Sequence, residues 1–228
     1  SVKRSIILGI ESSCDDTSAA ILVGHKIASN CIANQKIHQK YGGVVPELAS
    51  RAHQENIIPV VQEAITQANI EMNEIDAIAC TRGPGLMGSL VVGVSFAKSL
   101  ALALDVPIIE VNHMKAHILA HFIENPETQP PEFPFICLTV SGGHTQLVRV
   151  DSPYVMEVIG TTIDDAAGEA FDKAAKMIGI DYPGGPKLDE YAQDGDPLKF
   201  KFAKPKVSEL NFSFSGLKTS ILYNLRDW

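Results

Sequence analysis

The same order of strands and turns occurs twice in this sequence, and this repetition limits the folds that the chain can adopt. In the first copy, an apolar strand at 6–10 runs into a polar turn at 11–17, and the chain returns as a strand at 19–23. A turn at Gly24 then suits a hairpin that leads into a third strand at 26–33.

The second copy begins with an apolar strand at 135–140. It continues through a tight polar turn at 141–145 into a returning strand at 146–150, and a third strand is expected at 154–159. Two β-meanders of the same layout, each followed by helices, predict a duplicated α/β fold with two lobes around a cleft.

Helix and strand signals alternate between the two meanders. Pro46 suits the first turn of a helix, and Pro59 is expected to begin or kink a second helix. A strand at 75–81 precedes a glycine turn and a long apolar helix at 87–104, and a short strand follows at 107–111. The first lobe is therefore expected to combine one sheet with several helices.

A polar, proline-rich stretch at 125–134 marks the expected boundary between the lobes. We assign residues 1–133 to an N-terminal lobe and residues 134–228 to a second lobe. In the second lobe, helix signals resume after the meander, a glycine turn at 182–186 precedes a short helix, and Ser215 is expected to cap a last helix.

Composition and charge argue against several classes of protein. The 228 residues are 45% hydrophobic, enough for a substantial core, and the net charge of -8 argues against a broadly basic nucleic-acid binder. Four cysteines without a Cys-x-x-Cys pair favour reduced thiols in a cytosolic protein. The apolar run after Lys3 and Arg4 stops at Glu11, which is too early for the core of a signal peptide. The apolar helix near 89–104 is interrupted by Lys98 and is short for a membrane span. We expect a cytoplasmic protein without a membrane anchor.

The strongest candidate for chemistry is a pair of histidines, His113 and His117. Four residues apart on a helix, their imidazoles share one face and can bind one metal ion. Asn112 is a good N-cap for that helix. His121 lies about 12 Å along the axis from His113, too far to join the same small ion. Met114 stands where the His-Glu-x-x-His motif of zinc peptidases has its general-base Glu. The alternative to a metal site is a pair of histidines that are simply packed or solvated.

Two polar turns are candidates for binding charged groups. The Ser-Gly-Gly turn at 141–143 can present backbone N–H groups to an anion, although a plain hairpin turn explains the same residues. In the first meander, Glu11, Asp15 and Asp16 can position a cation or a water molecule, or can simply stabilise the turn by bonding to its backbone.

Three residues after the second meander suit a nucleoside. Asp172 and Asp189 offer carboxylates to ribose hydroxyls, and Gly185 offers bare backbone to a base. Solvated surface is the alternative for Asp189. Together with the two turns and the histidine pair, these residues predict a nucleotide-and-metal site in a bilobed fold.

The stretch 199–206 reads Lys-Phe-Lys-Phe-Ala-Lys-Pro-Lys. It is the only cationic cluster in the sequence with interleaved aromatic residues. An exposed amphipathic strand explains it at least as well as a contact with RNA does.

Long stretches of this sequence closely resemble those of one enzyme family, the tRNA N6-adenosine threonylcarbamoyltransferases called TsaD, formerly Gcp or O-sialoglycoprotein endopeptidase. The matching stretches are GIESSCDDT at 9–17, YGGVVPELASR at 41–51, GPGL at 83–86, HMKAH at 113–117, VSGGHT at 140–145, IDDAAGEAFD at 163–172, YPGGP at 182–186 and FSFSGLKT at 212–219. They occur in order over the whole chain, so the resemblance is specific.

This resemblance implies the actin-like fold of sugar kinases and chaperone ATPases, with the two meanders as its duplicated lobes. It also implies an activity: transfer of the threonylcarbamoyl group from threonylcarbamoyl-AMP to the N6 amine of an adenosine in tRNA. That adenosine lies beside the anticodon in tRNAs that read codons starting with A.

The resemblance further implies roles for individual residues. His113 and His117 match the histidines that hold one divalent ion, iron or zinc, and Glu11 matches an acidic residue of the catalytic site. The positions that hold the adenylate correspond to Thr139, Val140, Ser141, Gly142, Gly143, Asp172, Gly185 and Asp189. The implied partners are tRNA, threonylcarbamoyl-AMP, a TsaB-like paralogue and a TsaE-like ATPase, with no membrane.

Family members run on past the position of Trp228, and that further part holds an Asn that contacts the adenylate and an Asp that completes the metal site. The resemblance therefore implies that the second lobe is incomplete here and that the histidines form half of a metal site. We expect this chain alone to bind metal weakly or not at all.

Three other functions stay open at this point. A metallopeptidase, as the older name suggests, would need a general base, and only Lys115 stands close between the histidines. The fold alone is compatible with an ATP-dependent kinase or a chaperone-like ATPase. A non-enzymatic module that docks a partner subunit is the third alternative.

Overall fold

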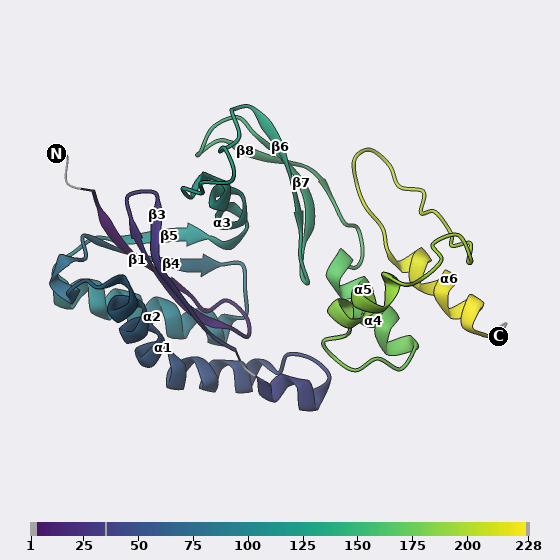
Figure 1. Cartoon of the computed structure of the whole chain (residues 1–228), viewed down its shortest axis with the longest axis horizontal. Helices are drawn as coiled ribbons and strands as arrows, with labels where there is room; N and C mark the ends of the chain where they lie inside the picture. Colours follow the sequence, from purple (N-terminus) through teal and green to yellow (C-terminus); the bar gives the residue numbers. More distant parts are fainter. Residues whose placement is uncertain (1–3, 35, 227–228) are drawn as a thin grey trace. The chain divides into compact units, whose positions relative to one another are not determined.

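The computed structural model describes residues 4–34 and 36–226. The chain divides into two compact units, and the boundary between them falls between Pro131 and Glu132, just before the position expected from the sequence. Each unit has its own β-sheet (Figure 1).

The first unit is built on a five-stranded mixed sheet. The strands lie in the order β3-β2-β1-β4-β5 and comprise β1 (Ile6–Glu11), β2 (Thr17–Val23), β3 (Lys26–Ala33), β4 (Ala77–Gly83) and β5 (Ile108–Asn112). The first three form the predicted antiparallel meander. Because β4 runs parallel to β1 and to β5, the carboxyl ends of these three strands lie at one edge of the sheet.

Two long helices cover one face of this sheet, and a short helix lies on the other (Figure 1). The long ones are α1 (Pro46–Ala68) and α2 (Met87–Leu104), and the short one is α3 (His113–Leu119). Three 3-10 turns, Lys36–Tyr41, Met72–Glu74 and Ala120–Phe122, complete the unit. The core between sheet and helices is apolar and includes Leu8, Ile10, Ile21, Ile57, Val61, Ile78 and Ala97.

Pro59 does not begin a second helix, because α1 continues through it. A proline inside a helix costs about 3 kcal/mol, since it removes one hydrogen bond and crowds the preceding turn. Buried residues on both sides of Pro59, namely Ile57, Val60 and Val61, pack into the core. Their burial outweighs that cost and keeps the two segments in one helix.

The apolar helix α2 is the one helix in the described part of the chain that is long and apolar enough, by length and composition, to cross a membrane. It packs on β4 and α1 and contributes Ala97 and Ala101 to the core. Gly93 lets it approach the loop after β1, because a Cβ atom at this position would collide with the side chain of Ser12.

The second unit begins with a three-stranded antiparallel sheet, β6-β7-β8. Its strands are β6 (Phe135–Val140), β7 (Thr145–Val150) and β8 (Met156–Thr161), which form the second predicted meander. Three helices follow, α4 (Ala167–Met177), α5 (Gly184–Ala192) and α6 (Ser215–Arg226), and α4 contacts both of the others.

Two details of this unit differ from the sequence prediction. The expected glycine turn at 182–186 already contains the start of α5, which begins at Gly184. Pro186 is tolerated there because the N–H groups of a first helical turn have no helical partner. The stretch 199–206, expected as a strand or an RNA contact, forms no strand and lies in the long connection between α5 and α6.

We predict that Gly93→Ala destabilises the protein by about 1 to 3 kcal/mol, because the added methyl group overpacks the contact between α2 and the first loop. Gly216→Ala is the matched control, since Gly216 also lies in a helix but has open space around its Cβ position. A lower thermal unfolding midpoint for Gly93→Ala alone is expected. Equal midpoints for the two variants would contradict the proposed close approach.

Candidate functional site

Three parallel strands bring the polar groups of the first unit together. Glu11 is the last residue of β1, Thr81 lies near the end of β4, and His113 follows β5 directly. Parallel strands end at the same edge of a sheet, and ligand sites commonly form there. The Thr81 hydroxyl donates to Glu11 Oε2 at 2.5 Å, and Nδ1 of His113 lies 3.2 Å from the same oxygen.

The histidine pair lies on α3 as predicted, and the two rings are in contact with each other. The Asn112 side chain caps the helix by accepting from the N–H groups of Met114 and Lys115, at 2.9 and 3.1 Å. This cap fixes where the helix begins, and therefore which face carries the histidines. The Nε2 atoms of His113 and His117 lie 3.0 Å apart, which is hydrogen-bonding distance, and their rings meet edge to face.

The geometry of the pair fits a bound metal ion. Two nitrogens that share one ion at about 2.1 Å are separated by about 3.0 to 3.4 Å for bond angles of about 90° to 110°, which matches the observed 3.0 Å. No group of three or more His, Cys, Asp and Glu side chains within 4–34 and 36–226 is arranged to hold an ion. Within the described residues, a metal ion at this place would therefore find two nitrogen donors, those of His113 and His117.

Glu11 contacts Nδ1 of His113, while the other ring nitrogen, Nε2, contacts His117. Burial would raise the pKa of this carboxyl, but hydrogen bonds from His113, Ser13 and Thr81 lower it to about 2, so Glu11 is ionised at neutral pH. The same bond to Glu11 raises the pKa of His113 above its ordinary value, against the effect of burial. Because a carboxylate only accepts hydrogen bonds, Nδ1 of His113 carries the proton and Nε2 is the atom that faces His117.

The loop after β1 is held by both long helices, which the sequence did not reveal. His53 of α1 is fully buried, donates from Nε2 to the carbonyl oxygen of Cys14 at 2.8 Å, and accepts from the Thr17 hydroxyl at Nδ1. The Ser12 hydroxyl donates to the carbonyl oxygen of Ser89 in α2 at 2.8 Å. These contacts fix the backbone that presents Glu11 to His113.

Cys14 lies in this loop and is exposed, but it is not activated. Desolvation and the neighbouring Asp15 raise the pKa of its thiol to about 11. The thiol stays protonated at neutral pH, and the thiolate is the nucleophilic form. The loop therefore provides orientation and charge, without a cysteine nucleophile.

A pocket of about 520 Å³ opens beside the histidine pair. Its walls come from the outer face of β1, β2 and β4 and from α3, and they are mostly apolar, including Ala20, Leu22 and Ala116. Glu11, Thr81, His113 and His117 supply its polar lining. The polar groups thus lie at one end of a largely apolar hollow.

In the second unit, the Ser-Gly-Gly turn joins β6 to β7 and contacts the start of α4. The N–H groups of Ala167 and Gly168 donate to Thr145 Oγ1 and to the carbonyl oxygen of Ser141, at 2.9 and 3.1 Å, so the first amides of the helix already have partners. A Cβ atom at Gly142 or Gly143 would meet nothing within 4 Å. These two glycines therefore leave backbone that an anion can approach.

Thr139, next to this turn, carries a buried hydroxyl without a partner. Its side chain is 6% exposed, and Oγ1 makes no hydrogen bond within the described residues. Leaving a buried hydroxyl unpaired costs about 1 to 3 kcal/mol. Such an atom is a natural contact for a ligand or an ordered water molecule. Val140, the other strand residue assigned to the adenylate, is exposed.

The structure brings Asp172 and Gly185 into direct contact. Asp172 Oδ1 of α4 accepts from the Gly185 N–H of α5 at 2.8 Å, which leaves Oδ2 open to another donor. Gly184 packs so closely on Ala175 that a side chain would collide there. Asp189 is exposed and lies one helical turn after Gly185 on the same face of α5.

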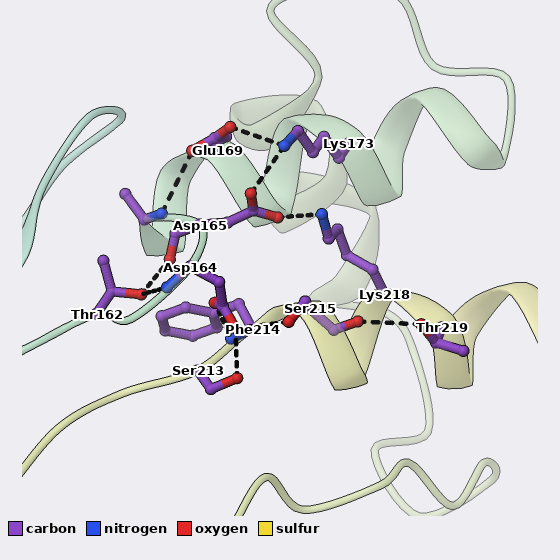
Figure 2. A network of polar contacts seen from close by, with 11 residues as sticks. Thr162, Asp164, Asp165, Glu169, Lys173, Ser213, Phe214, Ser215, Lys218 and Thr219 are labelled. Atoms are coloured by element: carbon purple, nitrogen blue, oxygen red, sulfur yellow. Dashed lines mark hydrogen bonds and ion pairs between the residues drawn. The ribbon is translucent and has the colours of Figure 1, made fainter. Parts of the chain in front are cut away.

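Two of the family-like stretches are joined by an aspartate pair (Figure 2). Asp164 accepts from the Ser213 hydroxyl, the Phe214 N–H and the Ser215 hydroxyl at 2.5 to 2.7 Å, and so caps the start of α6. Burial opposes ionisation, yet these bonds hold the pKa of Asp164 well below its usual range. Asp165 pairs with Lys173, at 2.8 Å, and with Lys218, and these bonds lower its pKa as well.

Solved structures with similar folds place the chain in the actin-like class of α/β proteins, as predicted. Component A of the (R)-2-hydroxyglutaryl-CoA dehydratase of Acidaminococcus fermentans matches 98% of this chain and 68% of its own, with a TM-score of 0.51 and 12% identity. The ROK hexokinase of Thermus thermophilus matches 84% of this chain and 70% of its own, with a TM-score of 0.50 and 18% identity.

Sequence comparisons then identify the family. The family model of TsaD, described as tRNA N6-adenosine threonylcarbamoyltransferase, matches residues 26–227. Proteins of that name from Christiangramia forsetii and Riemerella anatipestifer are both 65% identical to this chain, over 95% and 97% of it and over 64% and 65% of their own lengths. The chain belongs to the TsaD family, and it spans about two thirds of the length of these curated relatives.

We predict that Asp164→Ala loosens the first turn of α6, because a lost N-cap costs about 1 kcal/mol. Amide hydrogen exchange at 214–219 should become about fivefold faster at neutral pH. Asp181→Ala, an exposed aspartate of the same unit, is the control. Because the folded pKa of Asp164 is depressed, its contribution is full well above the unfolded value of about 3.9. It is lost as the pH falls through the lower folded value. Unchanged exchange in Asp164→Ala would refute the cap.

Proposed function

We propose that the chain is part of an enzyme that transfers the threonylcarbamoyl group from threonylcarbamoyl-AMP to the N6 amine of an adenosine in tRNA. The target is the adenosine adjacent to the anticodon in tRNAs that read codons starting with A. Membership of the TsaD family and the name shared by its relatives support this proposal. The observation that carries it is the histidine pair, with Nε2 atoms 3.0 Å apart and Glu11 behind His113.

In this proposal His113 and His117 hold one divalent metal ion, iron with zinc as the alternative. When bound, such an ion acts as a Lewis acid that polarises a carbonyl oxygen of the substrate. The imidazoles supply neutral nitrogen donors, and Glu11 keeps His113 in the tautomer whose Nε2 can bind. Thr81 and Ser13 hold Glu11 in turn. Since Glu11 bonds to His113, we assign it a positioning role rather than that of a proton donor.

The second unit is proposed to bind the adenylate. The open backbone at Gly142 and Gly143 suits its phosphate, and the unpartnered hydroxyl of Thr139, near the end of β6, suits a polar group of the ligand. Oδ2 of Asp172 and the carboxylate of Asp189 suit the ribose hydroxyls, while the bare backbone of Gly185 lets the nucleoside approach. Val140 has no polar side-chain group, so it would contact the adenylate through its backbone and its exposed apolar side chain.

The proposed reaction needs no covalent enzyme intermediate. The adenosine amine attacks the carbamoyl carbonyl carbon and a C–N bond forms. The bond between that carbon and the phosphate oxygen breaks, AMP leaves with its electron pair, and the proton lost by the amine passes to the solvent. The protein contributes binding and orientation of the two reactants. A protonated thiol at Cys14 agrees with this scheme.

The same proposal includes partners and a location. A TsaB-like paralogue and a TsaE-like ATPase would assemble with the protein, another enzyme would supply the adenylate, and the complex would act in the cytoplasm. A glycoprotease activity, suggested by the older family name, lacks support from the residues near the histidines. Glu11, the nearest carboxylate, is bonded to His113 and Thr81 instead of being free to act as a base.

We predict that His113→Ala and His117→Ala each lower the rate of tRNA threonylcarbamoylation by about a hundredfold or more, since each removes one metal ligand. The assay contains the full-length protein, tRNA, threonine, bicarbonate, ATP and the partner proteins. His121→Ala is the matched control, because His121 is exposed and lies in the 3-10 turn directly after α3.

Metal content measured by mass spectrometry should fall in the same two variants and not in His121→Ala. Full activity in either of the first two variants would refute the metal role of the pair. Cleavage of a glycoprotein by highly purified protein would instead support the peptidase.

A further inference from the structure

The connection between α5 and α6 is long and has no regular secondary structure over 201–207 (Figure 1). Connections longer than about 12 to 15 residues without their own secondary structure are uncommon in compact domains, and those that occur are often functional. Within it lies the basic segment, which we define as 199–206. Every residue of the basic segment is exposed.

The charge of the basic segment is concentrated, since it contains four lysines and no acid, although the whole chain has a net charge of -8. Three of its lysines, Lys201, Lys204 and Lys206, form no ion pair within the described residues. Lys173 and Lys218 of the same unit, in contrast, are both bound to Asp165. The basic segment therefore offers positive charge to a partner outside the protein.

Two phenylalanines lie among these lysines and are also exposed. Phe200 and Phe202 are 37% and 45% exposed, and their ring centroids lie 6.3 Å apart. Lys199 Nζ lies 5.7 Å from the centroid of the Phe200 ring. Exposed aromatic rings within a cationic stretch match the chemistry of proteins that bind single-stranded nucleic acid, in which bases stack on the rings and lysines contact phosphates.

The basic segment is also fixed on α6. The Ala203 N–H donates to the Ser220 hydroxyl at 3.0 Å, and the Asn224 side chain donates to the carbonyl oxygen of Lys201 at 3.4 Å. α6 is anchored at its start by Asp164. A segment that is already ordered loses less conformational entropy on binding than a free loop does. Both contacts with α6 use backbone atoms of the basic segment, so they do not occupy the side chains of Lys201, Lys204 and Lys206.

We propose that the basic segment 199–206 is an RNA-docking surface, which binds a single-stranded stretch of the tRNA through its lysines and its two phenylalanines. This inference rests on the proposed function for the identity of the RNA. The rings favour RNA over an acidic peptide, because a nucleobase can stack on an aromatic face while its phosphate meets a lysine.

The test measures binding of unmodified tRNA to the protein by fluorescence anisotropy at several salt concentrations. The first variant combines Lys201→Gln, Lys204→Gln and Lys206→Gln, and it should bind tRNA about tenfold or more weakly at moderate salt. Its plot of log affinity against log salt should be shallower by about two to three, since each of the three lost phosphate contacts removes about 0.7 to 0.9. A second variant, Phe200→Leu with Phe202→Leu, should weaken binding roughly tenfold and keep the salt slope.

The control variant combines Lys40→Gln, Lys98→Gln and Lys176→Gln, three exposed lysines outside the basic segment. It removes the same net charge, so it should bind tRNA like the wild type if the effect is local. Equal tRNA affinity and slope in the wild type and the first variant, or an equal loss in the first variant and the control, would overturn the proposal.

Threonylcarbamoylation measured on the same proteins, with their partners, separates this proposal from the proposed function. If the wild type modifies tRNA and the first variant does so with an unchanged KM for tRNA, the docking surface is refuted and the function stands. If the wild type shows no modification while the first variant still loses tRNA affinity against the control, the function is refuted and the docking surface stands.

Discussion

The hydrogen bond between Glu11 and Nδ1 of His113 determines the tautomer of His113 and which of its ring nitrogens faces His117. It exists because β1, β4 and β5 run parallel, so that a carboxylate, a hydroxyl and an imidazole from distant parts of the sequence meet at one edge of the sheet. A half-buried carboxylate is costly unless hydrogen bonds satisfy it. Thr81, Ser13 and His113 meet that requirement, and they keep Glu11 ionised. The direction of His113 Nε2 toward His117 follows from this bond.

The loop and helices around Glu11 serve the same arrangement. His53 and Ser89 fix the loop from α1 and α2, and Gly93 allows α2 to come close enough to do so. In the second unit, some polar groups are bonded within the protein and others are left accessible to a ligand. The amides at the start of α4 are used internally, while Gly142, Gly143, the Thr139 hydroxyl and Asp172 Oδ2 stay available. The groups assigned to the adenylate in the proposed function are thus groups that the fold leaves without a partner or open to approach.

Local patterns in the sequence predicted much of the fold. Alternating apolar strands and short polar turns defined both meanders, and helical spacing with an Asn112 cap placed the histidine pair on one face of α3. These features depend on neighbours within a few residues. Two local predictions were incorrect. Pro59 does not begin a new helix, because the packing of Ile57 and Val61 into the core keeps α1 continuous. The turn at 182–186 already contains the start of α5, where Gly184 packs closely against Ala175.

The supporting residues of the site could not be predicted, because each acts across a long sequence distance. Thr81 reaches Glu11, His53 reaches Cys14, and Asp164 reaches Ser215 only after the chain has folded. A serine or threonine in an apolar strand gives no local signal for such a role. The basic segment was visible as a charge pattern, but its attachment to α6 was not.

Anomalous X-ray diffraction at the metal edge, from crystals of the full-length protein loaded with iron or zinc, tests the central claim most directly. The account predicts one metal peak at about 2.0 to 2.2 Å from Nε2 of both His113 and His117, with Nδ1 of His113 still bonded to Glu11. A metal bound through Nδ1 of His113, to only one of the two histidines, or at another place would contradict it.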